Sequence, residues 1–119
     1  MLSISPATRV FVAVNPVDMR KGFNGLYGHV QEILQQDPLS GHLFVFSNRT
    51  HNRVRILFWD GSGLWVCAKR LEKGTFRWPE GDREAVCLRP EDLQMLLHGV
   101  EGKPRSRWYR TPTPGQMPA

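Results

Sequence analysis

The sequence predicts an α+β fold: an antiparallel β-sheet, a meander of about four to five strands, with one long helix packed on one face and a short C-terminal helix. Two observations carry this prediction. An apolar stripe at helical spacing runs through residues 19–36, and short β-branched and aromatic segments alternate with turn-forming residues over 42–78. A chain of 119 residues fits one domain of ordinary size. We therefore expect a single α+β domain over residues 1–101 and a basic, Pro- and Gly-containing flexible tail over residues 102–119.

The first strand and the long helix follow from the apolar pattern. Residues 9–14 are mostly β-branched or aromatic, which predicts a strand that ends at Asn15-Pro16. Asp18 is placed to cap a helix over about residues 19–36, and Asp37-Pro38 ends that helix. Its apolar stripe consists of Met19, Phe23, Leu26, Val30, Ile33 and Leu34. Three glycines at a spacing of three within this helix each cost about 1 kcal/mol relative to alanine, which suggests that another backbone packs very close.

The middle of the chain predicts the meander. Three strands are expected, at residues 42–47, 53–59 and 64–71. The tetrapeptide Asp60-Gly61-Ser62-Gly63 is a strong signal for a tight turn between the last two. Further along, the pattern predicts a short edge at 76–78, a strand at 83–88, and a helix from Pro90 to about residue 98 that stops at Gly99.

Turn length decides which side chains share a face of the sheet, because side chains alternate between faces along a strand. An even-length turn at 60–63 places Val54, Ile56 and Phe58 on one face with Trp65 and Cys67. A five-residue connection at 48–52 adds Phe44 and Phe46 to that face, which we expect the long helix to cover. The opposite face then carries Leu57, Trp59, Leu64 and Val66 near the turn, and Arg53, Arg55 and Arg70 at the far end.

Positive charge is concentrated in one part of the chain. The net charge is +5, and residues 49–77 carry seven basic side chains against two acidic ones. Such a concentration favours a site for a polyanion, although a solvated, solubilising surface has equal weight on charge alone. Guanidinium groups that face each other across strands repel, and either a bound polyanion or an acid from residues 80–92 would relieve that repulsion. We favour the polyanion, with these candidate contact residues: Arg20, Lys21, Arg49, Arg53, Arg55, Lys69, Arg70, Lys73 and Arg77.

Several function classes lack their sequence signatures. No run of about 20 apolar residues and no signal peptide occurs, so we expect a cytoplasmic protein without membrane contact. Cys67 and Cys87 are expected to be buried reduced thiols, and the four histidines are too scattered for a metal site. Neither a nucleotide-binding glycine motif nor a nucleophile elbow is present, so we expect no enzyme and no cofactor.

Four separated motifs resemble a known family. They are PVDMRKGF at 16–23 followed by Leu26, DPLSGHLFVF at 37–46, WDG at 59–61 with Gly63, and KRLEKG at 69–74 followed by FRWP at 76–79. Together they resemble the TnpB-type accessory protein, the second open reading frame, of the insertion sequence sixty-six family, over roughly residues 6–100. Two positions depart from the family pattern: Cys67 where an aromatic is usual, and Thr75 where a base is common. The resemblance implies a protein encoded beside a separate transposase and needed for efficient transposition, with no assigned catalytic residues or cofactor.

The resulting hypothesis is a non-catalytic accessory protein required for transposition of an insertion sequence. It would bind DNA, at the transposon ends or the target, through the basic sheet face and mostly through phosphates. The implied partners are DNA, the transposase and other proteins of the same element, and a homo-oligomer is left open. The first alternative is a protein-interaction module that bridges the transposase and another accessory protein through Trp59, Leu64 and Val66. Two others are a single-strand or RNA binder that stacks bases on Trp78, Trp108 or Tyr109, and a metal-dependent nuclease.

Overall fold

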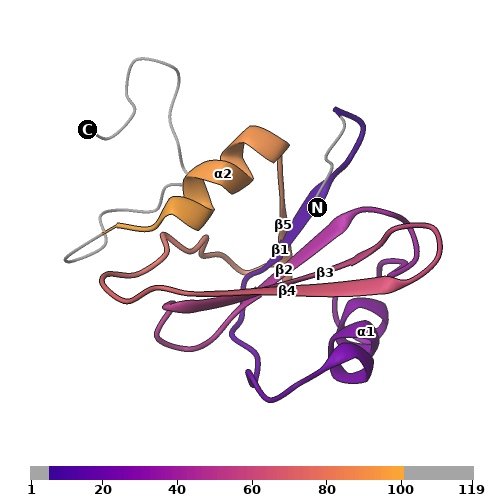
Figure 1. Cartoon of the computed structure of the whole chain (residues 1–119), viewed down its shortest axis with the longest axis horizontal. Coiled ribbons are helices and arrows are strands. Elements are labelled where there is room, and N and C mark those ends of the chain that lie inside the picture. Colours follow the sequence, from indigo (N-terminus) through magenta and orange to yellow (C-terminus); the bar gives the residue numbers. More distant parts are fainter. Residues whose placement is uncertain (1–5, 101–119) are drawn as a thin grey trace.

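A computed structural model of the protein describes residues 6–100. Its elements in chain order are β1 (Val10–Ala13), α1 (Phe23–Glu32), β2 (Leu43–Ser47), β3 (Arg53–Trp59), β4 (Leu64–Arg70), β5 (Ala85–Leu88) and α2 (Pro90–His98). The five strands form one sheet, and the two helices lie on its opposite sides (Figure 1). The predicted tail, residues 102–119, lies outside the described residues.

The sheet is mixed, so the predicted all-antiparallel meander is wrong. The strand order is β4-β3-β2-β1-β5, with β1 parallel to β2 and every other pair antiparallel. The three strands β2, β3 and β4 do form the expected meander. The difference arises because the chain between β1 and β2 includes α1, and a crossover that contains a helix returns the chain in its original direction. The predicted edge at 76–78 forms no strand; its neighbour Thr75 makes an isolated β-bridge with Val100.

The predicted long helix over residues 19–36 is also wrong, because α1 spans only Phe23–Glu32. Asp18 does not cap it: its carboxylate accepts from the backbone N–H of Arg20 at 2.9 Å, and its carbonyl accepts from the N–H of Lys21 at 3.0 Å. These bonds form a turn before the helix, and Gly22 then serves as an N-cap without a side-chain hydrogen bond. The helix ends shortly before Gln35, which has a left-handed φ of 56°. Two of the three glycines, Gly25 and Gly28, lie within α1, and their cost is consistent with a short helix.

The glycines of α1 do not support close packing of another backbone. A methyl group at Gly22 or Gly28 would meet nothing within 4 Å, and at Gly25 its nearest neighbours would be side-chain atoms of Lys21. Within the described residues, the predicted close approach is therefore absent.

Each face of the sheet has its own core. We call the side covered by α1 the α1 face; its buried side chains are Ala13, Leu26, Val30, Leu34, Phe44, Phe46 and Leu57. The α2 face is covered by α2 and by the segment 71–79; its buried side chains are Val10, Val12, Leu43, Val45, Val54, Ile56, Phe76, Trp78, Leu88, Leu93 and Leu96. The domain therefore has three layers, with the sheet in the middle.

The two predicted hairpin registers had different outcomes. In the second hairpin Ile56 lies opposite Cys67 and Phe58 opposite Trp65, which confirms the even turn at 60–63. In the first hairpin Phe44 lies opposite Leu57 and Phe46 opposite Arg55, so the two phenylalanines lie on the face opposite to the one predicted.

The first hairpin differs because its pairing begins one residue later than expected. Ser47 pairs with Val54, so six residues, 48–53, lie between the paired positions, although Arg53 is already the first residue of β3 and pairs with Arg70 of β4. The side-chain oxygen of Asn48 accepts from the N–H groups of Asn52 and Arg53 at 3.0 and 3.1 Å, and His51 adopts a left-handed φ of 56°. One extra residue changes the face of every side chain in the partner strand. As a result the first helix covers the face that carries Leu57 and the arginines.

Candidate functional site

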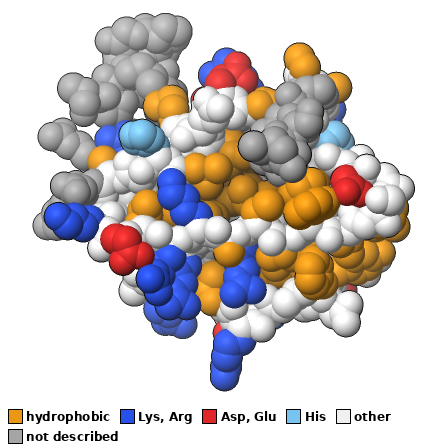
Figure 2. Space-filling view, viewed as in Figure 1, with side chains coloured by type: hydrophobic (Ala, Val, Ile, Leu, Met, Phe, Trp, Pro, Cys, Tyr) orange, Lys and Arg blue, Asp and Glu red, His pale blue; other side chains and the backbone are white. Residues whose placement is uncertain are grey.

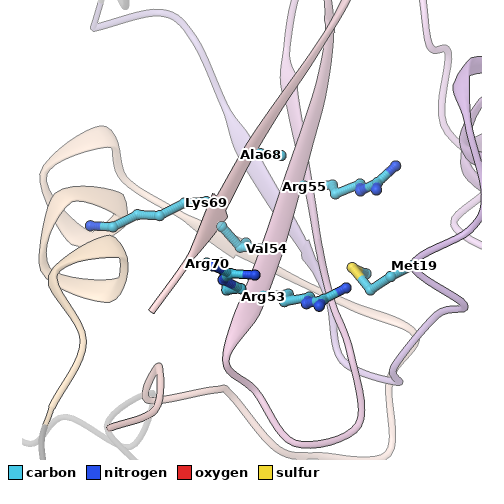
Figure 3. A pocket seen from close by; sticks show the side chains of 7 residues that line it. All are labelled: Met19, Arg53, Val54, Arg55, Ala68, Lys69 and Arg70. Atoms are coloured by element: carbon cyan, nitrogen blue, oxygen red, sulfur yellow. The ribbon is translucent and has the colours of Figure 1, made fainter. Parts of the chain in front are cut away.

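Three arginines converge on the α1 face at the end of the β3–β4 hairpin opposite to the turn. We call Arg53, Arg55 and Arg70 the arginine cluster. Arg53 lies directly opposite Arg70 on the neighbouring strand, and Arg55 lies opposite the small Ala68. The cluster borders an open cavity of about 330 Å³, whose lining also includes Met19 from the segment before α1 (Figure 3).

Along the β3–β4 hairpin, the α1 face has an apolar half near the turn and a charged half at the other end. Leu64 and Val66, near the turn, pack with α1 against Leu57, so the apolar half of the face is covered by this chain's own helix. Beyond that half the side chains are Arg53 and Arg70, both of which are exposed, and Arg55, which is half-buried. A short helix thus leaves the charged end of the hairpin open to solvent.

The three guanidinium groups have different partners. Nη1 of Arg55 donates to the carbonyl oxygen of Lys21 at 3.0 Å, which joins the sheet to the segment before α1. Arg70 forms an exposed ion pair with Glu72, with Nη2 at 3.0 Å from Oε2. Among the described residues Arg53 has no ion pair. The acid that relieves the repulsion therefore comes from Glu72 rather than from residues 80–92, and it offsets one of three charges.

The other predicted contact residues have partners or positions of their own, although Lys69 also lines the cavity. Arg20, whose side chain is 91% exposed, is paired with Asp18 at 2.8 Å; hydrogen bonds from Arg20 lower the pKa of that carboxyl to about 2. Lys69 reaches across the α2 face and donates to the carbonyl oxygen of Leu97 at 2.8 Å. Three more belong to connecting segments: Arg49 and Lys73 are exposed, and Arg77 is half-buried beside the core of the α2 face.

Of the nine predicted residues, four line one cavity, namely Arg53, Arg55, Lys69 and Arg70, and the backbone carbonyl of Lys21 accepts from Arg55. In the space-filling view, Lys and Arg side chains gather below one end of the sheet, beside a larger hydrophobic area (Figure 2).

The residues behind the alternative functions fall in unexpected places. Leu64 and Val66 are partly buried and pack against the α1-face core, so they do not form the uncovered apolar face that would favour an interaction module. Trp78 is only 6% exposed, and its Nε1 donates to the carbonyl oxygen of Ala13 at 2.8 Å, so its ring is unavailable for stacking. Trp108 and Tyr109 lie outside the described residues. The sequence reasoning missed Trp65, which is 48% exposed although its face was expected to be covered.

Further features of the described part of the chain bear on catalysis and metals. Between residues 6 and 100 no group of three or more His, Cys, Asp or Glu side chains is arranged to hold a metal ion. Ser47 Oγ lies 3.2 Å from Nδ1 of His51, but Ser47 is fully buried and could not reach a substrate. No described helix has the length and apolar character needed to cross a membrane.

The fold and the arginine cluster indicate the class of protein: a small α+β protein with a mixed sheet and a cationic site on its surface. The particular family follows from the sequence, because the pattern described as "IS66 Orf2 like protein" matches residues 8–107. The chain belongs to this family, and it is an accessory protein associated with the transposition of IS66-type insertion sequences. The resemblance noted from the four motifs is thereby confirmed.

Two similar proteins come from Sinorhizobium fredii (strain NBRC 101917 / NGR234). The uncharacterized protein y4hO is 38% identical over 112 residues, which cover 93% of this chain and 97% of the relative. The uncharacterized protein y4jC is 39% identical over 101 residues, which cover 85% of this chain and 86% of the relative. No solved structure matches the chain.

Proposed function

We propose that this accessory protein binds the DNA of its insertion sequence, at the element's ends or at the target, through the arginine cluster. One observation carries the proposal: three guanidinium groups surround an open cavity, and a single carboxylate, that of Glu72, offsets them. Arg53 and Arg70 face each other directly, which is unfavourable unless an anion lies between or above them. A phosphate group satisfies this requirement, and the planar fork of arginine matches phosphate geometry.

The contacts are expected to involve phosphates more than base edges. The helices α1 and α2 span 10 and 9 residues, and their only basic side chains are His29 and His98, near their C-terminal ends. Neither helix carries an arginine or lysine, the side chains that most often read guanine in the major groove, and their amide side chains are Asn24 and Gln31 on α1 and Gln94 on α2. Phosphate contacts fix position on a duplex and carry no sequence information, so sequence choice would fall to a partner. We propose that the transposase of the same element, in the cytoplasm, is that partner.

A salt titration tests the proposal with a matched pair of variants. Arg53→Gln/Arg70→Gln removes one arginine without an ion pair and one that is paired with an acid. The control Arg9→Gln/Arg89→Gln also removes one unpaired and one paired arginine, but at the other edge of the sheet, beside β1 and β5. Arg9 has no ion pair among the described residues, and Arg89 pairs with Asp92 at 3.2 Å. Both variants lose the same formal charge.

If the cluster contacts phosphates, the slope of log affinity against log salt on duplex DNA flattens by about 1 to 2 for Arg53→Gln/Arg70→Gln. The loss should be nearly equal on element-end and random duplexes, and the control should keep the wild-type slope within about 0.5. Equal flattening in both variants would show that only net charge matters, and it would refute the arginine cluster as the site. A wild-type protein that binds no duplex at low salt would refute the proposed function.

A further inference from the structure

We propose that Trp65, on the open edge of β4, is a stacking platform for an unpaired base of a DNA strand. The inference rests on the proposed function for its ligand, DNA, and adds the form of DNA and a second contact point. It is carried by the geometry of one exposed indole, whose position is independent of the arginine cluster: Trp65 lies on the α2 face and the cluster on the α1 face.

The indole is exposed because β4 is an edge strand. The sheet order places β3 on one side of β4 and no strand of the described chain on the other. Trp65 keeps 48% of its surface exposed, whereas its neighbour across the strands, Phe58, is half-buried against the core. An aromatic ring of this kind is not needed to close the core of the α2 face.

The orientation of the ring is fixed from two directions. Its plane is parallel to that of Phe58, with an interplanar angle of 5° and 6.1 Å between ring centroids. Its Nε1 donates to Oδ2 of Asp60 at 2.7 Å. The other carboxylate oxygen of Asp60 accepts from the N–H groups of Ser62 and Gly63, both at 2.8 Å, so the acceptor is itself held by the turn. A ring held in this way loses little conformational entropy when a base stacks on it.

The charges along β4 favour a nucleic-acid strand as the occupant. Lys69 lies on the same face as Trp65, four residues along the strand or about 13 Å away. At the opposite end Asp60 carries a negative charge beside the indole. A base at Trp65 with its phosphates directed toward Lys69 and away from Asp60 therefore matches the sign of the charge at both ends. Stacked platforms combined with basic tracks are typical of single-strand binding.

Duplex DNA does not suit this site. The faces of its bases are covered by their neighbours, and a protein ring reaches them only where bases are unpaired or flipped out. The structure therefore predicts that Trp65 contributes to single-stranded or locally melted DNA and not to intact duplex.

The test compares Trp65→Leu with Phe23→Leu in the full chain. Phe23 is 50% exposed on α1, so the control removes an aromatic ring of equal exposure away from β4. Binding is measured by fluorescence anisotropy with a labelled oligothymidine of about 12 nucleotides and with a duplex of the same length. We expect Trp65→Leu to weaken oligothymidine binding by about 5- to 50-fold and to leave duplex binding unchanged, and Phe23→Leu to leave both unchanged.

A second measurement needs no variant. An oligonucleotide that carries 5-iodouracil is photocrosslinked to the wild-type protein, and mass spectrometry is expected to locate the adduct on Trp65. Adducts confined to other residues, or equal losses in the two leucine variants, would overturn the inference. Duplex binding without oligothymidine binding would overturn it while leaving the proposed function intact, and failure to bind either DNA would overturn both.

Discussion

Arg55 differs from the other members of the arginine cluster because one of its donors is used within the protein. Its bond to the carbonyl of Lys21 is the described hydrogen bond that joins the hairpin to the segment before α1. Arg55→Met keeps the apolar stem and removes this donor, so we expect the free energy of unfolding to fall by about 0.5–1.5 kcal/mol. Arg53→Met, at an exposed position without an ion pair, should stay within about 0.5 kcal/mol of the wild type. Urea denaturation of both variants checks this, and equal stabilities would show that the bond contributes nothing.

His51 predicts a pH dependence at the scale of a single side chain. Burial lowers its pKa below the usual 6.5, and the ring stacks on Trp78 with an interplanar angle of 11°. A folded-state pKa below the unfolded value means that the unfolded chain binds more protons in the window between the two. Stability is therefore full above about pH 6.5 and falls as the pH drops through that window.

His51→Asn tests this pH dependence because asparagine tolerates the left-handed φ of 56° at this position. We expect the unfolding temperature of the wild type to drop between pH 7 and pH 5, and the variant to drop less. His29, whose pKa is also lowered by burial, acts in the same direction, so part of the dependence should remain. Identical pH profiles for the variant and the wild type would contradict the assignment to His51.

At the scale of single elements, the connection between β2 and β3 shows what a sequence pattern leaves undetermined. The strands themselves were predicted at 42–47 and 53–59, close to the observed bounds. The predicted connection at 48–52 agrees with those bounds, but the Asn48 side chain accepts from the N–H of Arg53, and Ser47 pairs with Val54 instead of Arg53. A side-chain hydrogen bond of this kind leaves no trace in hydrophobic periodicity, and its consequence is large because one residue changes the face of a whole strand.

Two glycines in the helical parts of the chain predict opposite effects on replacement by alanine. Gly99 ends α2 with φ 79° and ψ 171°, and a methyl group there would lie 2.8 Å from Cδ1 of Leu71. This backbone conformation is essentially restricted to glycine, so Gly99→Ala should cost about 1–3 kcal/mol. Gly28 lies within α1 with open space around it, so Gly28→Ala should stabilise by about 0.5–1 kcal/mol. Thermal unfolding of the pair checks both signs, and a stabilising Gly99→Ala would contradict the cap geometry.

At the scale of the whole molecule, the sequence predicted most elements but not their arrangement. The positions of β3, β4 and α2 follow from local periodicity and turn signals, and they are close to the prediction. The parallel pairing of β1 with β2 is a contact between distant segments, and nothing in either strand specifies the direction of its neighbour. The covering of both faces, by α1 and α2, depends on the same long-range arrangement.

The candidate site was predicted only in part, because local patterns in the sequence do not specify contacts between distant segments. Arg53, Arg55 and Arg70 were expected to share one face because the turn at 60–63 sets the parity of their hairpin, and the register confirms it. The remaining six basic residues were grouped by their closeness in sequence or their place beside a helix, and of these Lys69 alone lines the cavity of the cluster. The length of one turn decides which side chains of a hairpin share a face, and this can be read from neighbouring residues. The position of a loop relative to the sheet depends on contacts between distant segments, and it cannot be read in that way.

The last prediction concerns the division of the chain at residue 101. The outermost described contact is the bridge between Thr75 and Val100, whose two N–H···O bonds are each 2.8 Å long. A chain that ends at residue 101 keeps this bridge and α2, so its unfolding temperature should stay within a few degrees of the full chain. Residues 103–119 carry four basic and no acidic side chains, so the same truncation should flatten the salt slope on duplex DNA if they also contact phosphates.

A chain that ends at residue 89 loses Leu93 and Leu96, both 1% exposed and each worth about 1.5–3 kcal/mol of burial, and it should not unfold cooperatively. A truncation at 101 that abolishes cooperative unfolding would place the domain boundary further along the chain.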